Sequence, residues 1–184
     1  MARNVIAILR GVQPDEVEAV GEAILAEGIS ILEVPLNSPD PLRSIAKLAA
    51  AFGAEARVGA GTVLSPDDVS DVAKAGGRIV VSPDCNPQVI EATKAMGMAS
   101  YPGVATPTEC FTALRHGADG LKLFPSFLFG VEGFKAVSAV LPEGTSCYAV
   151  GGVAPENFAE WINAGVAGFG IGSAIYKAGN SPKP

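Results

Sequence analysis

The sequence predicts a single-domain α/β fold, a (β/α)8 barrel of the TIM type, spanning residues 1–184. Strand-like and helix-like segments alternate from end to end, with roughly 20–26 residues per unit, and eight such units follow one another without a break in composition. A doubly wound open sheet is the alternative. We prefer the barrel because eight similar units close naturally and none stands out as the start of a nucleotide-binding βαβ unit.

The predicted strands are short apolar runs, and several of them end at glycine or proline, which mark turns. In chain order they are Val5–Leu9, Ile31–Leu36, Arg57–Ala60, Arg78–Val81, Met98–Tyr101, Gly120–Phe124, Cys147–Val150 and Gly168–Ile171.

The predicted helices between these strands begin with recognisable N-terminal signals. Ser65 is an N-cap followed by a proline, and Thr106 with Glu109 has the pattern of a capping box. The first two predicted helices span Pro14–Glu27 and about 40–52, and the last two span about 131–141 and Ala154–Ala164. The three helices between them are predicted to begin at Ser65, Asn86 and Thr106. After Ser173 only eleven proline-rich residues remain, so we expect the eighth outer helix to be short or missing. Either the chain is truncated or a neighbouring subunit covers that flank.

Composition excludes several classes of function. The formal charge of −6 comes with no acidic block and no basic stripe, which argues against a nucleic-acid partner. No apolar run approaches the ~20 residues that span a bilayer, and the start lacks a signal peptide's pattern, so we expect a cytoplasmic protein. The three cysteines lack metal-ligand spacing, and we expect no metal. His116, the single histidine, ends a predicted helix and is not taken as catalytic.

A lysine interrupts the apolar strand predicted at Gly120–Phe124. Because side chains alternate across a strand, Leu121 and Leu123 share one face and Lys122 points to the other. If the leucines pack under a helix, Lys122 faces the enclosed interior, where desolvation lowers the pKa of its amine. Such an amine is a nucleophile able to form a Schiff base. An edge-strand lysine, or one whose head reaches water, is the alternative.

Glu33 occupies the interior face of the second predicted strand, while Leu32 and Val34 take the face toward the helices. The barrel geometry therefore sends Glu33 and Lys122 to the same interior. A buried carboxylate near an amine is either a structural ion pair or a general acid/base. We favour catalysis, because the interior positions contain one such lysine and one such glutamate.

Barrel enzymes place their sites at the C-terminal ends of the strands. The first strand ends at Arg10, which suits a carboxylate group, and the third ends at Gly61 and Thr62, which by themselves indicate a tight turn. Glycines follow the seventh and eighth strands, where backbone N–H groups commonly bind a phosphate. The candidates for this phosphate cradle are Gly151, Gly152, Gly172 and Ser173.

These residues belong to motifs that closely resemble the 2-keto-3-deoxy-6-phosphogluconate/galactonate aldolase family. The motifs are Ile8–Gly11, Glu33–Pro39, Gly59–Leu64, Leu121–Ser126 and Ala149–Val153. The resemblance covers almost the whole chain. It implies a metal-free and cofactor-free class I aldolase on a trimeric (β/α)8 barrel, acting on a phosphorylated 2-keto-3-deoxy sugar acid.

The resemblance also implies a role for each candidate residue. Lys122 would form the Schiff base with the keto carbon, and Glu33 would shuttle protons through a water. Arg10 and Thr62 would hold the pyruvyl carboxylate. The glycines and Ser173 named above would hold the phosphate.

Details of the motifs look like the phosphogalactonate branch of the family. They are Arg10-Gly11, the Leu36–Pro39 run and Val150, which stands where the phosphogluconate enzymes carry threonine. Val150 is therefore the predicted specificity residue, and the expected reaction is cleavage of 2-dehydro-3-deoxy-6-phosphogalactonate to pyruvate and glyceraldehyde 3-phosphate. Phe127 departs from the small residue expected after Ser126.

Three alternatives remain open at this point. The phosphogluconate epimer could be the main substrate, since one pocket methyl gives only ~1–3 kcal/mol of discrimination. A phosphosugar isomerase or epimerase on the same fold would keep the phosphate cradle but need no Schiff-base lysine. The chain could also be a trimer-forming structural module with a vestigial site.

Overall fold

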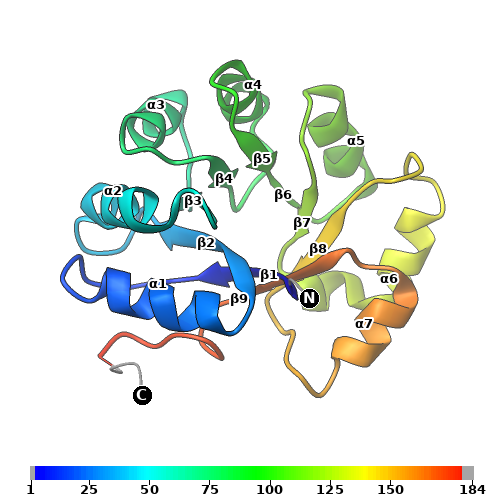
Figure 1. Ribbon diagram of the computed structural model, residues 1–184. Coiled ribbons are helices and arrows are strands. Elements are labelled where there is room, and N and C mark those ends of the chain that lie inside the picture. The colour runs from blue at the N-terminus through cyan, green and yellow to red at the C-terminus, as the bar shows by residue number, and fades with distance from the viewer. Residues whose placement is uncertain (1–2, 180–184) are drawn as a thin grey trace.

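Strands and helices alternate through the described part of the chain, residues 3–179 of a computed structural model (Figure 1). The strands are β1 (Arg3–Ile8), β2 (Ile29–Pro35), β3 (Arg57–Gly61), β4 (Ile79–Val81), β5 (Ala99–Tyr101), β6 (Gly103–Val104), β7 (Leu121–Leu123), β8 (Cys147–Val150) and β9 (Gly168–Ile171). The helices are α1 (Val17–Ala26), α2 (Pro41–Phe52), α3 (Pro66–Lys74), α4 (Pro87–Ala95), α5 (Pro107–Arg115), α6 (Ser126–Ser138) and α7 (Phe158–Ala164).

The strands form a parallel sheet that closes into a barrel, as predicted. Their order is β5-β4-β3-β2-β1-β9-β8-β7-β6, so the two outermost strands, β5 and β6, are consecutive in the sequence. The predicted strand Met98–Tyr101 corresponds to β5, and β6 is an additional strand that the sequence does not predict. Pro102 separates the two, because proline has no N–H to donate to a neighbouring strand. The Pro102 carbonyl still accepts the Lys122 N–H at 2.9 Å. The two edge strands of the sheet, β5 and β6, are therefore joined directly through Pro102.

Seven helices surround the barrel in chain order, and no eighth helix follows β9 within the described residues (Figure 1). Residues 172–179 form a turn instead, in which the N–H groups of Ile175 and Tyr176 both donate to the Gly172 carbonyl, at 2.9 and 3.0 Å. The expectation of a short or missing eighth helix is confirmed up to residue 179. Residues 180–184 lie outside the described residues.

The predicted N-terminal signals position most helices correctly. Ser65 and Asp68 form a reciprocal capping box at the start of α3. The starts of three helices differ from the prediction. The first helix begins at Val17 rather than Pro14, and α7 begins at Phe158 rather than Ala154. Helix α6 begins five residues early, at Ser126, with a non-helical break at Gly130.

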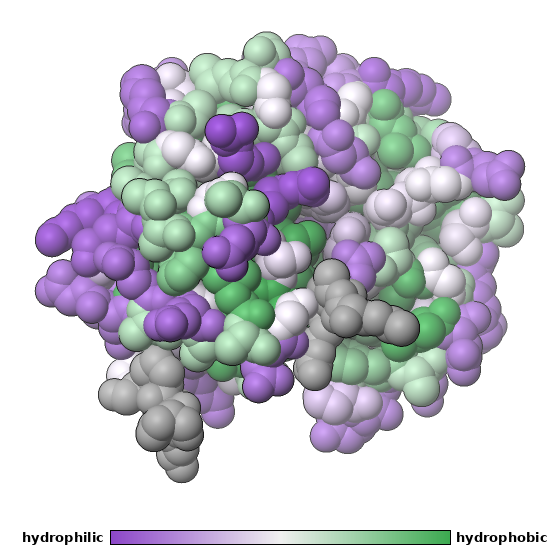
Figure 2. Space-filling view, in the orientation of Figure 1, coloured by the Kyte–Doolittle hydropathy of each residue, from purple (hydrophilic) through white to green (hydrophobic). Residues whose placement is uncertain are grey.

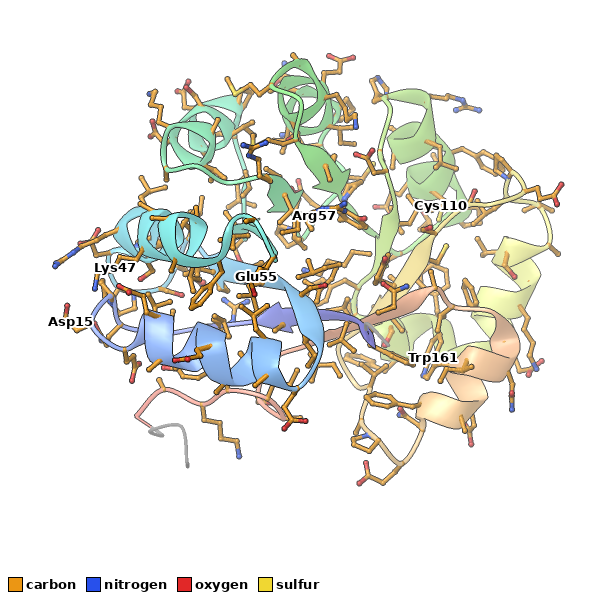
Figure 3. The ribbon with its side chains drawn as sticks, viewed as in Figure 1. Asp15, Lys47, Glu55, Arg57, Cys110 and Trp161 are labelled. Atoms are coloured by element: carbon orange, nitrogen blue, oxygen red, sulfur yellow. The ribbon has the colours of Figure 1, made fainter. Side chains whose placement is uncertain are left out.

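Alternation along the strands divides the buried side chains into two layers. The interior of the barrel contains Ile6, Ile79, Val81, Tyr101, Tyr148 and Val150. The outer layer lies between the strands and the helices, where Leu121 and Leu123 are fully buried together with Cys110 from α5 and Trp161 from α7 (Figure 3). Lys122, between the two leucines, therefore faces the interior, in register with Tyr148 of β8.

Hydrophilic residues cover much of the surface in the view of Figure 2, with smaller apolar patches between them. Within residues 3–179, no helix is both long enough and apolar enough to cross a membrane.

Candidate active site

Lys122 lies in the middle of β7 with its side chain almost entirely buried, at 8% exposure. Its Nζ lies 4.4 Å from the centre of the Phe124 ring. Phe124 is two residues further along the chain and therefore on the same face as Lys122. Burial lowers the pKa of the amine, and the positive charge of Arg10 acts in the same direction, while Glu33 opposes them. The neutral, nucleophilic form of this lysine is therefore favoured relative to a lysine in water.

Glu33 lies on β2 and is 2% exposed. Burial raises the pKa of its carboxyl to about 7, against the opposing charges of Lys122 and Arg10. Its Oε2 is buried and has no hydrogen-bond partner among the described residues. An unpaired buried oxygen is costly for stability, so its presence in a native structure calls for an explanation, and a catalytic role is one such explanation.

Gly61 makes room for the Glu33 carboxyl. A Cβ built on Gly61 would lie 1.9 Å from Glu33 Oε2 and 2.3 Å from its Cδ, well inside van der Waals contact. The neighbouring Thr62 has a φ of 58°, a left-handed conformation that a β-branched residue adopts only at a cost. The end of β3 is thus shaped around the Glu33 carboxyl group, a role for Gly61 that the sequence pattern does not indicate.

Arg10 is fixed by the loop that follows β2. Its Nη1 donates to Asn37 Oδ1, and the N–H of Gly11 donates to Ser38 Oγ at 3.0 Å. These two contacts tie the ends of β1 and β2 together. The Asn37-Ser38 pair, which in the sequence only resembles one branch of the family, therefore positions the arginine.

Most of the predicted phosphate cradle lines one cavity of about 440 Å³ at the ends of β8 and β9. Gly151 has a φ of 83°, which only glycine adopts without strain. Gly152 does not line this cavity, and its carbonyl accepts the Asn157 Nδ2 at 3.0 Å. The lining residues are Ile8, Arg10, Phe124, Val150, Gly151, Gly170, Gly172, Ser173, Tyr176, Lys177 and Ala178.

Arg10 connects this cavity with the buried pair. It lines the cavity, and its charge also lowers the pKa values of both Lys122 and Glu33. Thr62, Glu33 and Lys122 do not line the cavity themselves. The arrangement is therefore a buried amine and carboxyl on one side of an arginine and a glycine-lined cavity on the other.

Two polar lining residues, Tyr176 and Lys177, are absent from the candidates that the sequence provides. They follow the last strand, where no helix pattern or motif marks them. Phe127 is 66% exposed, close to Gly152 and outside the cavity lining, so its size does not obstruct the cavity.

Comparisons with known proteins place the chain in a family with this fold. Residues 1–182 match the family model of KDPG and KHG aldolase. The chain is 49% identical to 2-dehydro-3-deoxy-6-phosphogalactonate aldolase of Escherichia coli (strain K12), over 96% of this chain and 86% of that protein.

Two solved structures are similar over most of their length. The native KDPGal structure has a TM-score of 0.94 and 48% identity, covering 96% of this chain and 86% of that one. KDPG aldolase from Legionella pneumophila, with pyruvate captured at low pH as a covalent carbinolamine intermediate, has a TM-score of 0.85 and 31% identity, covering 94% of this chain and 83% of that one. The chain belongs to the KDPG and KHG aldolase family.

Proposed function

We propose that the protein is a class I aldolase that cleaves 2-dehydro-3-deoxy-6-phosphogalactonate to pyruvate and glyceraldehyde 3-phosphate. The observation that carries the proposal is the buried amine of Lys122, with its lowered pKa, in the same interior as a carboxyl that has an unpaired oxygen. The 49% identity to a relative with this activity supports the choice of sugar.

The first half of the reaction joins the substrate to the lysine. The neutral Nζ of Lys122 attacks the C2 carbonyl carbon, and the carbonyl oxygen takes up a proton to give a carbinolamine. Glu33 donates a proton to the departing hydroxyl, and water leaves as the iminium forms. A carboxyl with a pKa of about 7 suits this work, because both its acid and its carboxylate forms are populated near neutral pH.

The second half breaks the C3–C4 bond. Glu33, now a carboxylate, accepts the C4 hydroxyl proton through a water, and the electrons of the C3–C4 bond move into the iminium to give an enamine. Glyceraldehyde 3-phosphate leaves, C3 of the enamine is protonated, and water releases pyruvate from Lys122. Arg10 and Thr62 hold the carboxylate, while the N–H groups of Gly151 and Gly172 and the hydroxyl of Ser173 hold the phosphate.

Borohydride trapping tests this proposal. In the presence of pyruvate, reduction should convert the imine into a stable secondary amine, and peptide mass mapping should place the added mass on Lys122. A folded sample that gives no adduct on Lys122 would contradict the aldolase mechanism. It would favour an isomerase or a structural module on the same fold.

Adding one methyl group at Gly61 should disturb Glu33. In Gly61→Ala the new Cβ cannot coexist with the present carboxyl position, and a displacement of about 1 Å costs roughly 100-fold in kcat/KM. The matched control is Gly133→Ala in α6, where the nearest contact would be an ordinary 3.8 Å and activity should be unchanged. Steady-state cleavage rates of both variants check the prediction, and equal activities would contradict it.

Val150 is expected to select the sugar epimer. It is 5% exposed at the end of β8, and its Cγ2 would lie 2.7 Å from a Cβ built on Gly170 of β9. Val150→Thr replaces a methyl by a hydroxyl and should shift the kcat/KM ratio toward the phosphogluconate epimer by roughly 5- to 100-fold. Val140→Thr, at a position 62% exposed, is the control. An unchanged ratio would remove Val150 from the specificity determinants.

We also propose a homotrimer. Phe127 and Leu128, at the start of α6, are each 66% exposed, and large apolar side chains next to each other at a surface are typical of subunit contacts. Sedimentation equilibrium should give three times the chain mass.

A further inference from the structure

The cavity at the ends of β8 and β9 contains a cation that no motif assigns. Its charged lining residues are Arg10 and Lys177. Arg10 is hydrogen-bonded to Asn37. Lys177 is exposed, and within residues 3–179 it has no ion-pair partner. Its ammonium group is therefore free to bind an anion that enters the cavity.

The turn that carries Lys177 is anchored on both sides of it. Tyr176 is 7% exposed, and its hydroxyl donates to Glu16 Oε1 at 2.6 Å, just before α1. Ala178 lies against the β1–α1 loop, with its Cβ 3.2 Å from the position a Cβ would take on Gly11. The backbone of Lys177 is thus held beside the cavity, although its side chain is free, and this turn occupies part of the flank below α1 in Figure 1.

The charges of the proposed substrate favour a cation at this cavity. At pH 7 the phosphate carries about −2 and the carboxylate −1. The chain itself has a formal charge of −6, which repels a trianion. Lys122 must be neutral to attack, and backbone N–H groups supply only partial charges. If Arg10 holds the carboxylate, Lys177 is the remaining full positive charge on the cavity wall.

We infer that Lys177 is the charged phosphate ligand of this site, and that its anchored turn makes the enzyme selective for phosphorylated over unphosphorylated 2-keto-3-deoxy acids. The inference rests on the proposed function and adds a residue from the segment after the last strand. Sequence motifs in the glycine-rich loops account for the N–H donors, and Lys177 accounts for the charge.

Kinetics of three variants test the inference. Lys177→Gln should raise KM for the 6-phosphorylated substrate roughly 10- to 100-fold with kcat within about threefold, because a charge-assisted hydrogen bond is lost. Its kcat/KM for the unphosphorylated 2-keto-3-deoxygalactonate should not change. Lys177→Arg should restore most of the lost affinity. Lys135→Gln, an exposed lysine on α6 that pairs with Glu132, is the control and should match wild type.

A binding measurement separates this inference from the aldolase proposal. Glycerol 3-phosphate, titrated calorimetrically, should bind Lys177→Gln roughly 10-fold or more weakly than wild type, whether or not Lys122 forms an adduct with pyruvate. If Kd and KM in Lys177→Gln stay within twofold of wild type, the inference is overturned and the aldolase mechanism is untouched. Equal losses with the phosphorylated and unphosphorylated substrates would also overturn it, because they indicate a structural role.

Discussion

Lys122→Arg is expected to lower kcat for cleavage by roughly 10⁴-fold or more. It should also abolish the borohydride trapping of pyruvate. A guanidinium keeps the positive charge but has no neutral amine at working pH with which to form an imine. The result therefore separates covalent chemistry from charge stabilisation. An isomerase that uses Lys122 only as a cation would keep measurable turnover in Lys122→Arg.

Arginine is bulkier than lysine in a site where Lys122 is only 8% exposed, so loss of activity needs a second variant. Lys122→Met keeps the length of the side chain and removes a buried amine whose pKa burial has already lowered, so the fold should be retained. Circular dichroism and thermal unfolding check folding, and Lys135→Met is the control for the chemical change. Cleavage by a folded Lys122→Met protein would contradict the Schiff-base mechanism.

Lys122 and Glu33 could be found from the sequence because strand periodicity is local. A charged residue between two leucines, or between Leu32 and Val34, can face only one side of its strand, and the repeated units predict that this side is the barrel interior. The structure places both residues as that argument requires, with 8% and 2% exposure.

Contacts between distant segments could not be predicted in this way. Tyr176 meets Glu16 across 160 residues of sequence, and Arg10 meets Asn37 across a strand pair, because barrel closure brings these loops together. No local sequence pattern therefore marks Lys177 as a residue of the site. Gly152 illustrates the opposite case, since a Gly-Gly pair suggests two cradle residues while only Gly151 lines the cavity.

Glu33→Gln should nearly abolish cleavage, by roughly 10²- to 10⁴-fold in kcat, since an amide can neither donate nor accept the protons of carbinolamine formation and C–C cleavage. The same change should stabilise the fold at high pH. Burial raises the pKa of Glu33 from 4.5 to about 7, so the folded protein holds a proton there that the unfolded chain has released. The contribution of the Glu33 carboxyl to the free energy of unfolding is therefore fully present below about pH 4.5 and is lost as the pH rises through about 7.

The lost stability is about 3 kcal/mol when the carboxyl is fully ionised, at 1.36 kcal/mol per unit of pKa shift. Glutamine has no such penalty, so the free energy of unfolding of Glu33→Gln should exceed that of wild type by up to ~3 kcal/mol at pH 8.5 and be similar to it at pH 4.5. Urea unfolding at both pH values measures the difference, with the exposed Glu55→Gln as control (Figure 3). An inactive Glu33→Gln protein that is no more stable than wild type at pH 8.5 would mean that the carboxylate is already well stabilised there. Proton transfer at neutral pH would then need a different acid.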